Sequence, residues 1–395
     1  MKISYNTLRD WFIIRNRETI SAKWLVLCIY LLPITQLISN LLSTTTQLNY
    51  YAYPSLFIFF ILLYLRPLDK MSFLLLIVFF YYSLLFTNDS LSGRASYMIT
   101  FTLTCLALIT LPKLDVIKLS KEKIDLYFSI LCYSIIILFF CTAVLRRDVL
   151  AKRAYLEGYI IPHAFAYYMA IFGYYFLMRR KFLLAGIPLI AGCIVGTRTG
   201  VMLILLAILS FLLIELKSLK FATIIKISII GGILIIALFI FSGKARSQLN
   251  SVFNSFKGFS YSVEKGDKTS KSYSSNRSLL MAIGIDQIRK DGISISNILG
   301  RGPRSSYEFI RKSLTWKIWF HNDFMEIAFS LGIINLIIYL YAIFYYCKKM
   351  KSLFFFLFLL IAAFTNGFYF YSSFTLIGVH YLTEITKEKK LVISS

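Results

Sequence analysis

The sequence predicts an all-α polytopic membrane protein with about 12 transmembrane helices and one large, partly helical loop on the outer side. Of the 395 residues, 58% are hydrophobic and only 16% are charged, whereas about a quarter of a soluble domain is charged. Apolar runs of about 20 residues recur along the chain, and each can cross a bilayer core of about 30 Å. One long polar interval, residues 242–321, interrupts these runs.

The apolar runs divide the chain into three parts. Residues 1–241 are expected to form a bundle of about nine spans, residues 242–321 the loop, and residues 322–395 the C-terminal transmembrane helices and a tail. In the stretch 352–383, the interruption at Thr365–Gly367 favours a hairpin of two short helices. The basic N-terminal residues before the first run suggest a retained signal anchor. The other candidate spans are 24–43, 50–65, 71–87, 96–111, 125–145, 159–178, 181–196, 199–215, 222–241 and 322–346.

The basic loops predict that both termini are cytoplasmic. With a cytoplasmic N-terminus, every inside loop carries at least two Lys or Arg, and the outside loop 44–49 carries none. This pattern explains part of the formal net charge of +24, so no nucleic-acid partner is expected. Residues 242–320 break the rule, because they hold fourteen basic and five acidic residues. Such positive charge on the outer face indicates an anionic ligand.

Residues that bind metals are sparse. The six cysteines are scattered without a CxxC pair, and the chain has only three histidines, so no zinc site is expected. His163 and His380 lie in or near spans and are expected to be satisfied core residues. No Asp-x-Asp motif is present to hold a divalent cation beside phosphates. We therefore expect chemistry that needs neither a metal nor a cofactor.

The second half of the loop is predicted to be helical. Residues 242–276 are polar and rich in Ser and Lys, without apolar periodicity. From Arg277, apolar residues recur at helical spacing until Asp291–Gly292 ends the helix. A Gly-Arg-Gly-Pro turn at 300–303 and a second helix, Ser305–Ser313, follow.

A polar cluster, His321–Asn322–Asp323, opens the apolar run after the loop, and Glu326 shares a helical face with Asp323. One interpretation is a helix cap, with Asn or Asp accepting from backbone N–H groups and Glu complementing the helix dipole. We favour a catalytic or substrate-binding role, because polar groups at the rim of an apolar helix are costly unless they face water or a substrate. The two roles are compatible, since Asn322 can cap the helix while His321 faces a cavity.

Several arginines are candidate ligands of an anion. Arg198 lies in Gly-Thr-Arg-Thr-Gly, where glycines allow a tight turn, although a lone arginine there could simply snorkel to the interface. Arg277 opens a helix, where positive charge is unfavourable for the dipole, and this favours an external anion over a solvated charge. Arg301 and Arg304 surround the Gly-Pro turn, for which a plain turn is an equal alternative. Arg153 lies in a basic loop that can equally be solvated. Arginine forks bind phosphate bidentately, which together with the membrane suggests a lipid diphosphate.

These residues resemble the motifs of the O-antigen polymerase/O-antigen ligase superfamily. The resemblance rests on an arginine-led helix, a Gly-x-Gly-Pro turn and a His-Asn stretch that ends in Glu and is followed by a glycine. Thr-Arg-Thr at 197–199 is similar to the upstream arginine motif, and Met325 departs from the more usual leucine. The matching segments are Asn276–Leu280, Asn297–Pro303, His321–Glu326 and Leu331–Ile333.

The resemblance implies a metal-independent, inverting, GT-C-like glycosyltransferase with a periplasmic loop in a bacterial inner membrane. Such enzymes move a glycan from undecaprenyl diphosphate to an acceptor hydroxyl. Arg198 and Arg277 would hold the diphosphate and stabilise charge on the leaving group. His321 would act as general base or as a second phosphate ligand. The residues expected to bind or orient substrate are Asn322, Asp323, Glu326, Arg301, Arg304 and Arg153.

We favour a polymerase of O-antigen or a related polysaccharide, which uses a lipid-linked repeat unit as acceptor. The first alternative is a ligase, which uses the lipid A core, and the sequence barely separates the two. A flippase of lipid-linked oligosaccharide is the rival from another class, but it would show inverted repeats and charges near the membrane midplane, and neither is evident. The implied partners are the undecaprenyl-diphosphate-linked oligosaccharide, the bilayer, a chain-length regulator and a flippase.

Overall fold

The part of the chain that the structure describes is almost entirely helical, as predicted. The exception in this part is a short parallel pairing of β1 (Ile20–Ser21) with β2 (Val116–Ile117). The computed structural model describes residues 20–21, 25–34, 77, 91–113, 116–117, 121–145, 162–195, 197–215, 277–314, 319–365, 367–369 and 373–393.

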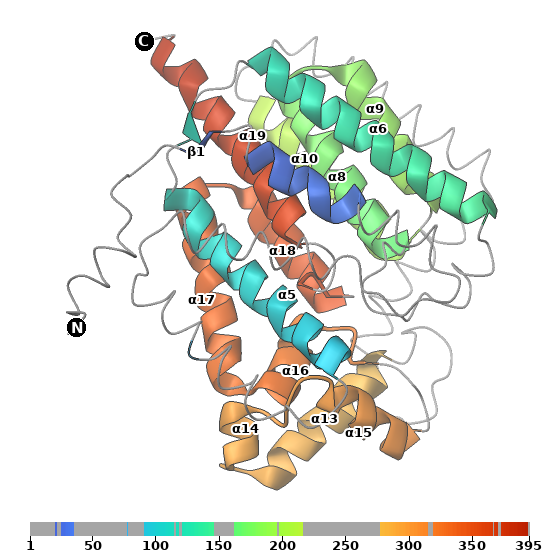
Figure 1. Ribbon diagram of the computed structural model, residues 1–395, viewed down its shortest axis with the longest axis vertical. Helices are drawn as coiled ribbons and strands as arrows, with labels where there is room; N and C mark the ends of the chain where they lie inside the picture. Colours follow the sequence, from blue (N-terminus) through green and yellow to red (C-terminus); the bar gives the residue numbers. More distant parts are fainter. Residues whose placement is uncertain are drawn as a thin grey trace, which may run out of the picture.

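One group of helices packs around α8, as Figure 1 shows. The group consists of α6 (Lys121–Leu145), α8 (Pro162–Met178), α9 (Phe182–Val195) and α10 (Arg198–Glu215). Residues 164–177 of α8 are all buried, because neighbours cover every face of this helix. Small residues bring the backbones close together, since a Cβ added at Gly200 of α10 would lie 2.3 Å from the Cβ of Ala166 on α8.

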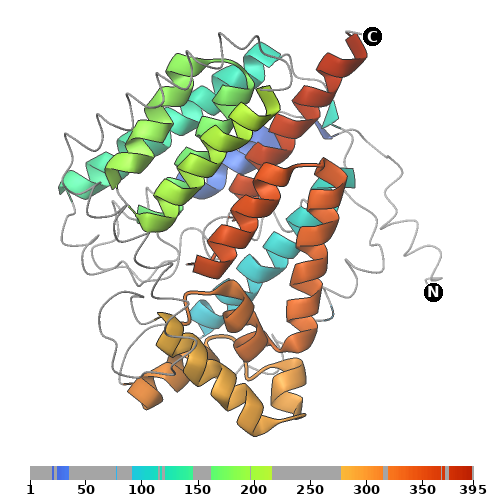
Figure 2. The same ribbon diagram turned by 180° about the vertical axis from the view of Figure 1, so that it is seen from behind.

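A second group packs against the first through α19, which contacts both α8 and α5 (Figure 2). This group consists of α5 (Leu91–Thr110), the 3₁₀ turn η1 (Leu111–Lys113), α17 (Ile333–Met350), α18 (Leu353–Thr365) and α19 (Ser373–Ile393). His380 of α19 joins three of these segments. Its Nδ1 lies 2.9 Å from the Tyr346 hydroxyl, its Nε2 lies 2.8 Å from the Ser352 hydroxyl, and its ring stacks on Phe355. The prediction that His380 is a satisfied core residue is confirmed.

The helices of the loop form a small subdomain at one end of the molecule (Figure 1). They are α13 (Arg277–Asp291), α14 (Ile295–Leu299) and α15 (Ser305–Leu314). This subdomain has its own apolar core, formed by Leu280, Ile310, Phe320, Met325 and Phe329. The two predicted loop helices and the turn between them are confirmed, whereas α14 was not predicted. The polar residues 242–276 lie outside the described residues.

The predicted spans can be compared with these helices. The runs 96–111, 125–145, 159–178, 181–196 and 199–215 match α5, α6, α8, α9 and α10, and the predicted hairpin is confirmed as α18 and α19. The run 24–43 is helical at Leu25–Ile34. The runs 50–65, 71–87 (apart from residue 77) and 222–241 lie outside the described residues.

Several helices present large apolar side chains on the outside of the molecule, as expected of helices in contact with lipid. Two described helices are long and apolar enough to cross a membrane, Lys121–Cys141 and Ile333–Met350, and five shorter apolar helices accompany them. The total of about 12 spans stays a prediction. Exposed apolar residues include Ile130, Ile137, Leu183, Ile194, Leu209, Leu213, Ile337 and Phe344.

An ion cluster fixes α6 to the turn between α8 and α9. The buried carboxylate of Asp125 accepts from Nε of Arg179 at 2.9 Å and from the Tyr175 hydroxyl at 2.6 Å, and it pairs with Nζ of Lys181 at 2.9 Å. This carboxylate therefore neutralises two cations of the turn between α8 and α9.

Asp125→Asn is expected to lower the free energy of unfolding by about 2–4 kcal/mol, because it leaves a nearly buried arginine without its counter-charge. Thermal unfolding of the purified protein in detergent measures the loss. Glu122→Gln is the comparison variant, since Glu122 lies one turn earlier on α6, is exposed and interacts with Arg179 only weakly, so a smaller loss is expected. Equal melting temperatures for the two variants would contradict the role of Asp125 as the counter-charge of Arg179.

Candidate functional site

The chain does not enter α17 as one continuous helix. The prediction of a single span from 322 to 346 is wrong in its first part, where α16 (Asp323–Glu326) is followed by a π-helical turn, η2 (Ile327–Leu331), and then by Gly332 with φ 90°. The apolar residues of this segment were predicted to form part of a membrane span, but they pack inside the protein. Met325 and Phe329 are buried in the core of the loop subdomain, so the pattern does not mark a lipid-facing helix.

Glu326 is the centre of a buried hydrogen-bond cluster. Its Oε1 accepts from three hydroxyl groups, at 2.5 Å from Tyr97, 2.6 Å from Ser306 and 3.0 Å from Ser330. Its Oε2 accepts from the backbone N–H of Phe320 at 3.3 Å. The Glu326 carboxylate therefore joins α5, α15, η2 and the segment that precedes His321. Burial raises the pKa of Glu326, and these hydrogen bonds partly oppose that rise.

Two glycines bring the loop turn into contact with the start of α17. A Cβ added at Gly332 would lie 2.4 Å from the carbonyl oxygen of Ile298, and one at Gly300 would lie 2.5 Å from that of Ser330. Both glycines have positive φ, and the N–H of Gly302 donates to the Ser330 carbonyl at 2.9 Å. The Gly-x-Gly-Pro turn and the glycine after the His-Asn stretch are therefore the two sides of a single backbone contact.

Asp323 is fully buried and holds the turn between α18 and α19. Its Oδ2 accepts from the N–H of Phe368 at 2.6 Å, the N–H of Tyr369 at 3.3 Å and the hydroxyl of Tyr339 at 2.9 Å. Its Oδ1 is buried and has no hydrogen-bond partner among the described residues. Burial raises the pKa of Asp323 to about 7, the hydrogen bonds oppose the rise, and the neighbouring Glu326 adds to it.

Asn322 caps α16, as the sequence suggested, and its amide also binds two other segments. Its Oδ1 accepts from the N–H of Met325 at 2.9 Å. Its Nδ2 donates to the carbonyl of Phe364, at the end of α18, at 3.0 Å, and to the sulfur of Met281 on α13 at 3.9 Å.

The contacts of Asn322 gather the segments that carry the predicted catalytic residues. Met281 lies one turn after Arg277 on α13. Phe364 precedes Thr365, whose hydroxyl accepts from the Thr199 hydroxyl at 3.1 Å, next to Arg198 at the start of α10. The beginnings of α10, α13 and α16 are therefore linked through α18 and Asn322.

His321 lies at the surface of this assembly in an uncommon backbone conformation. Its φ is 54°, in the left-handed region that few residues other than glycine adopt, and its side chain is partly exposed. Its ring packs on Trp319 with 4.8 Å between ring centroids. The neighbours on both sides, Phe320 and Asn322, are buried and hydrogen-bonded, so the chain around the imidazole is held in place.

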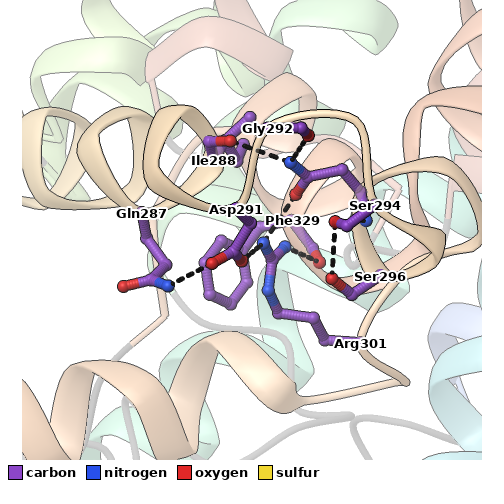
Figure 3. Close-up of polar contacts among 9 residues, drawn as sticks. Gln287, Ile288, Asp291, Gly292, Ser294, Ser296, Arg301 and Phe329 are labelled. Atoms are coloured by element: carbon purple, nitrogen blue, oxygen red, sulfur yellow. Dashed lines mark hydrogen bonds and ion pairs between the residues drawn. The ribbon is translucent and has the colours of Figure 1, made fainter.

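Arg301 is bound to protein groups within the loop subdomain, as Figure 3 shows. Its guanidinium pairs with the carboxylate of Asp291, donates to Oδ1 of Asn297 at 2.6 Å and to the carbonyl of Phe329 at 3.1 Å. The guanidinium carbon also lies 4.2 Å from the centre of the Phe329 ring. The pairing lowers the pKa of Asp291. We therefore assign Arg301 to fixing the turn between α14 and α15.

The other predicted arginines are placed less completely. Arg304 lies in the turn before α15 with φ 67°, and its role in substrate binding stays a prediction. Arg198 and Arg277 are the first residues of α10 and α13, but their side chains lie outside the described part of the structure, as does all of Arg153.

Several residues of the site carried little or no sequence signal. Ser330 lies one turn after Glu326 and could have been read from helical spacing. Tyr97 lies 229 residues away from Glu326, and Tyr339 lies within the apolar run of α17, so only the fold reveals their contacts.

A comparison with protein families found one match. Residues 182–340 match the family model described as O-antigen ligase. That range includes α9, α10, the loop helices and the first part of α17, and thus every described segment of the site except α5, α18 and the turn before α19. No curated protein and no solved structure matches the chain.

Gly332→Ala is expected to lower the free energy of unfolding by about 2–4 kcal/mol, because alanine is strained at this positive φ and its Cβ would overlap the Ile298 carbonyl. Thermal unfolding in detergent, combined with limited proteolysis of the loop helices, measures the effect. Gly186→Ala is the control, since a Cβ at Gly186 meets nothing within 4 Å. A Gly332→Ala protein that melts and resists protease like this control would contradict the backbone contact.

The stability of the protein is expected to fall as pH rises through 7 because of Asp323. Folding raises the pKa of this carboxyl from 3.8 to about 7, so its contribution is fully present below pH 3.8 and is lost as it ionises in the fold. Between pH 5 and pH 8 the loss is about 2.6 kcal/mol, and most of it occurs below pH 7. Asp323→Asn keeps an oxygen acceptor and cannot ionise, so melting temperatures should depend less on pH in the variant. The same pH dependence in both proteins would refute this.

Proposed function

We propose that the chain polymerises O-antigen or a related surface polysaccharide, and the premise is the match of residues 182–340 to the family model described as O-antigen ligase. The donor is a glycan on undecaprenyl diphosphate, and the acceptor is a lipid-linked repeat unit. The reaction inverts the anomeric carbon and needs no metal, as the resemblance implies.

One observation carries the proposal: the helix starts that bear Arg198 and Arg277 are tied to the segment that bears His321. The ties run through Asn322 to Met281 on α13 and to Phe364 on α18, and from Thr365 to Thr199 on α10. A glycosyl transfer from a lipid diphosphate needs cations at the leaving group and a base at the acceptor, within reach of one another.

In the proposed reaction the acceptor hydroxyl attacks the anomeric carbon of the donor glycan. The bond from that carbon to the diphosphate breaks, and undecaprenyl diphosphate leaves. Arg198 and Arg277 bind the diphosphate and stabilise the negative charge that develops on it. His321 accepts the proton of the hydroxyl, so that the new glycosidic oxygen is neutral.

Asn322, Asp323 and Glu326 act as positioning residues in this scheme. Apart from Oδ1 of Asp323, their polar side-chain atoms are hydrogen-bonded to the protein, and Asp323 and Glu326 are fully buried. Glu326 holds the N–H of Phe320 on one side of His321, and Asn322 caps α16 on the other side. The base is therefore presented from a fixed stretch of chain, which limits the conformational freedom lost on reaching the transition state.

Transfer to the lipid A core is the second candidate function, because the matching family model is described as O-antigen ligase. Both reactions use the same donor and the same leaving group, and they differ only in the acceptor. The described site contains the parts that the two reactions share, so a phenotype is needed to tell them apart.

A silver-stained lipopolysaccharide gel of a deletion strain tests the proposal. We expect a lipid A core that bears a single repeat unit, which indicates a missing polymerase. Unsubstituted core with lipid-linked polymer would indicate the ligase instead. An unchanged ladder would refute both functions for O-antigen and would point to a capsule substrate or to transport.

Complementation with variants then tests the residues. Arg198→Ala, Arg277→Ala and His321→Ala are each expected to lower polymer formation by about 100-fold or more, because each removes a charge or a base that acts in the transition state. Arg289→Ala is the matched control, since Arg289 is an exposed arginine near the other end of α13. Normal long chains in all three variants, at wild-type protein levels, would rule out the assigned site.

A further inference from the structure

The turn between α13 and α14, together with α14 itself, exposes isoleucines that a water-facing surface would not favour. Ile293 is 99% exposed, Ile295 is 76% exposed and Ile298 is 39% exposed. Ile295 and Ile298 are three residues apart on α14 and therefore lie on one face of this helix. We call these three residues the isoleucine tip. Such apolar groups gathered at one place on a surface mark a contact with something apolar.

The isoleucine tip lies beside the start of α17. A Cβ at Gly332 would lie 2.4 Å from the carbonyl oxygen of Ile298, so the backbone of α14 touches the residue that precedes α17. Both views show α14 directly beneath the first turn of α17 (Figures 1 and 2). α17 is one of the two described helices that can cross a membrane.

The exposed apolar surface of α17 begins in its first turn, next to the isoleucine tip. Ile333, Ile334 and Ile337, in its first two turns, are 43%, 39% and 60% exposed. If these side chains face lipid, the bilayer begins where α14 packs, and the isoleucine tip continues the same apolar surface.

Charged residues near the tip suit the polar boundary of a bilayer. Arg289 and Lys290 are exposed in the last turn of α13, and Lys290 also pairs with Asp286 at 2.7 Å. Asp291 is paired with Arg301 and so adds no free negative charge. Basic groups beside an apolar face are typical of segments that lie in the interface of an anionic membrane.

We propose that the isoleucine tip inserts into the bilayer beside α17, among the acyl chains of the leaflet nearest the loop subdomain. The tip then holds the loop subdomain against the membrane at one edge, while α13 and α15 extend away from it. Under the proposed function, this contact sets the height of His321 above the lipid surface from which the diphosphate emerges. The membrane contact itself does not depend on that function.

Thiol reactivity in lipid nanodiscs tests the insertion. Ile293→Cys and Ser313→Cys are made in the full chain with Cys141→Ser, which removes the exposed native thiol, and each reacts with a charged, membrane-impermeant methanethiosulfonate. Ser313 is the matched control, because it is exposed in the last turn of α15, on the far side of the subdomain from α14. The thiolate is the reactive form, and apolar surroundings disfavour it.

We expect the thiol at 293 to react at least about 10-fold more slowly than the thiol at 313, and the two to react alike after transfer to urea. Equal rates in nanodiscs would overturn the proposal. A second measurement adds an environment-sensitive fluorophore at each thiol and spin-labelled phospholipids in the nanodisc. Quenching at 293 that is no stronger than at 313 would likewise overturn it. Neither experiment contains a glycan substrate, so failure of the enzyme assignment leaves the result unaffected.

Discussion

The buried carboxylate of Glu326 is the constraint on which the rest of the site depends. A carboxylate without partners in an apolar interior is very costly, so its position requires the donors that surround it. Those donors come from Tyr97 on α5, Ser306 on α15, Ser330 on η2 and the backbone of Phe320. Satisfying one side chain therefore fixes the loop subdomain to the membrane helices and fixes the segment next to His321.

The neighbouring contacts extend this arrangement in two directions. The close approach of Gly300 and Gly332 lets the loop turn pack on the start of α17 without intervening side chains. Asp323 orders the turn after α18, and Asn322 connects that helix with α13. These contacts hold the backbone around His321, whose partly exposed imidazole lies at the junction of the membrane helices and the loop subdomain. Preorganisation of this kind lowers the cost of positioning a reacting group.

The sequence predicted the helical class, most of the described helix ranges and the turn at 300–303, because these depend on local patterns of apolar residues and glycine. It failed at 322–332, where an apolar helical pattern was interpreted as a span. Burial in a second, small core gives the same periodicity as burial in lipid, and only the packing of Met325 and Phe329 tells them apart. It also could not pair Tyr97 with Glu326, since no local pattern links residues so far apart in the chain. Arg301 was predicted to bind substrate, with a plain turn as an equal alternative, and its partners in the fold favour the structural role.

Polymer formation by the purified protein tests the central claim most directly. The full chain is reconstituted in liposomes with undecaprenyl-diphosphate-linked repeat units and no other protein, and the products are separated by size. The account predicts glycans of several repeats on the lipid carrier, together with released undecaprenyl diphosphate. The account is contradicted if the repeat units stay single, both when they are incubated alone and when lipid A core is added.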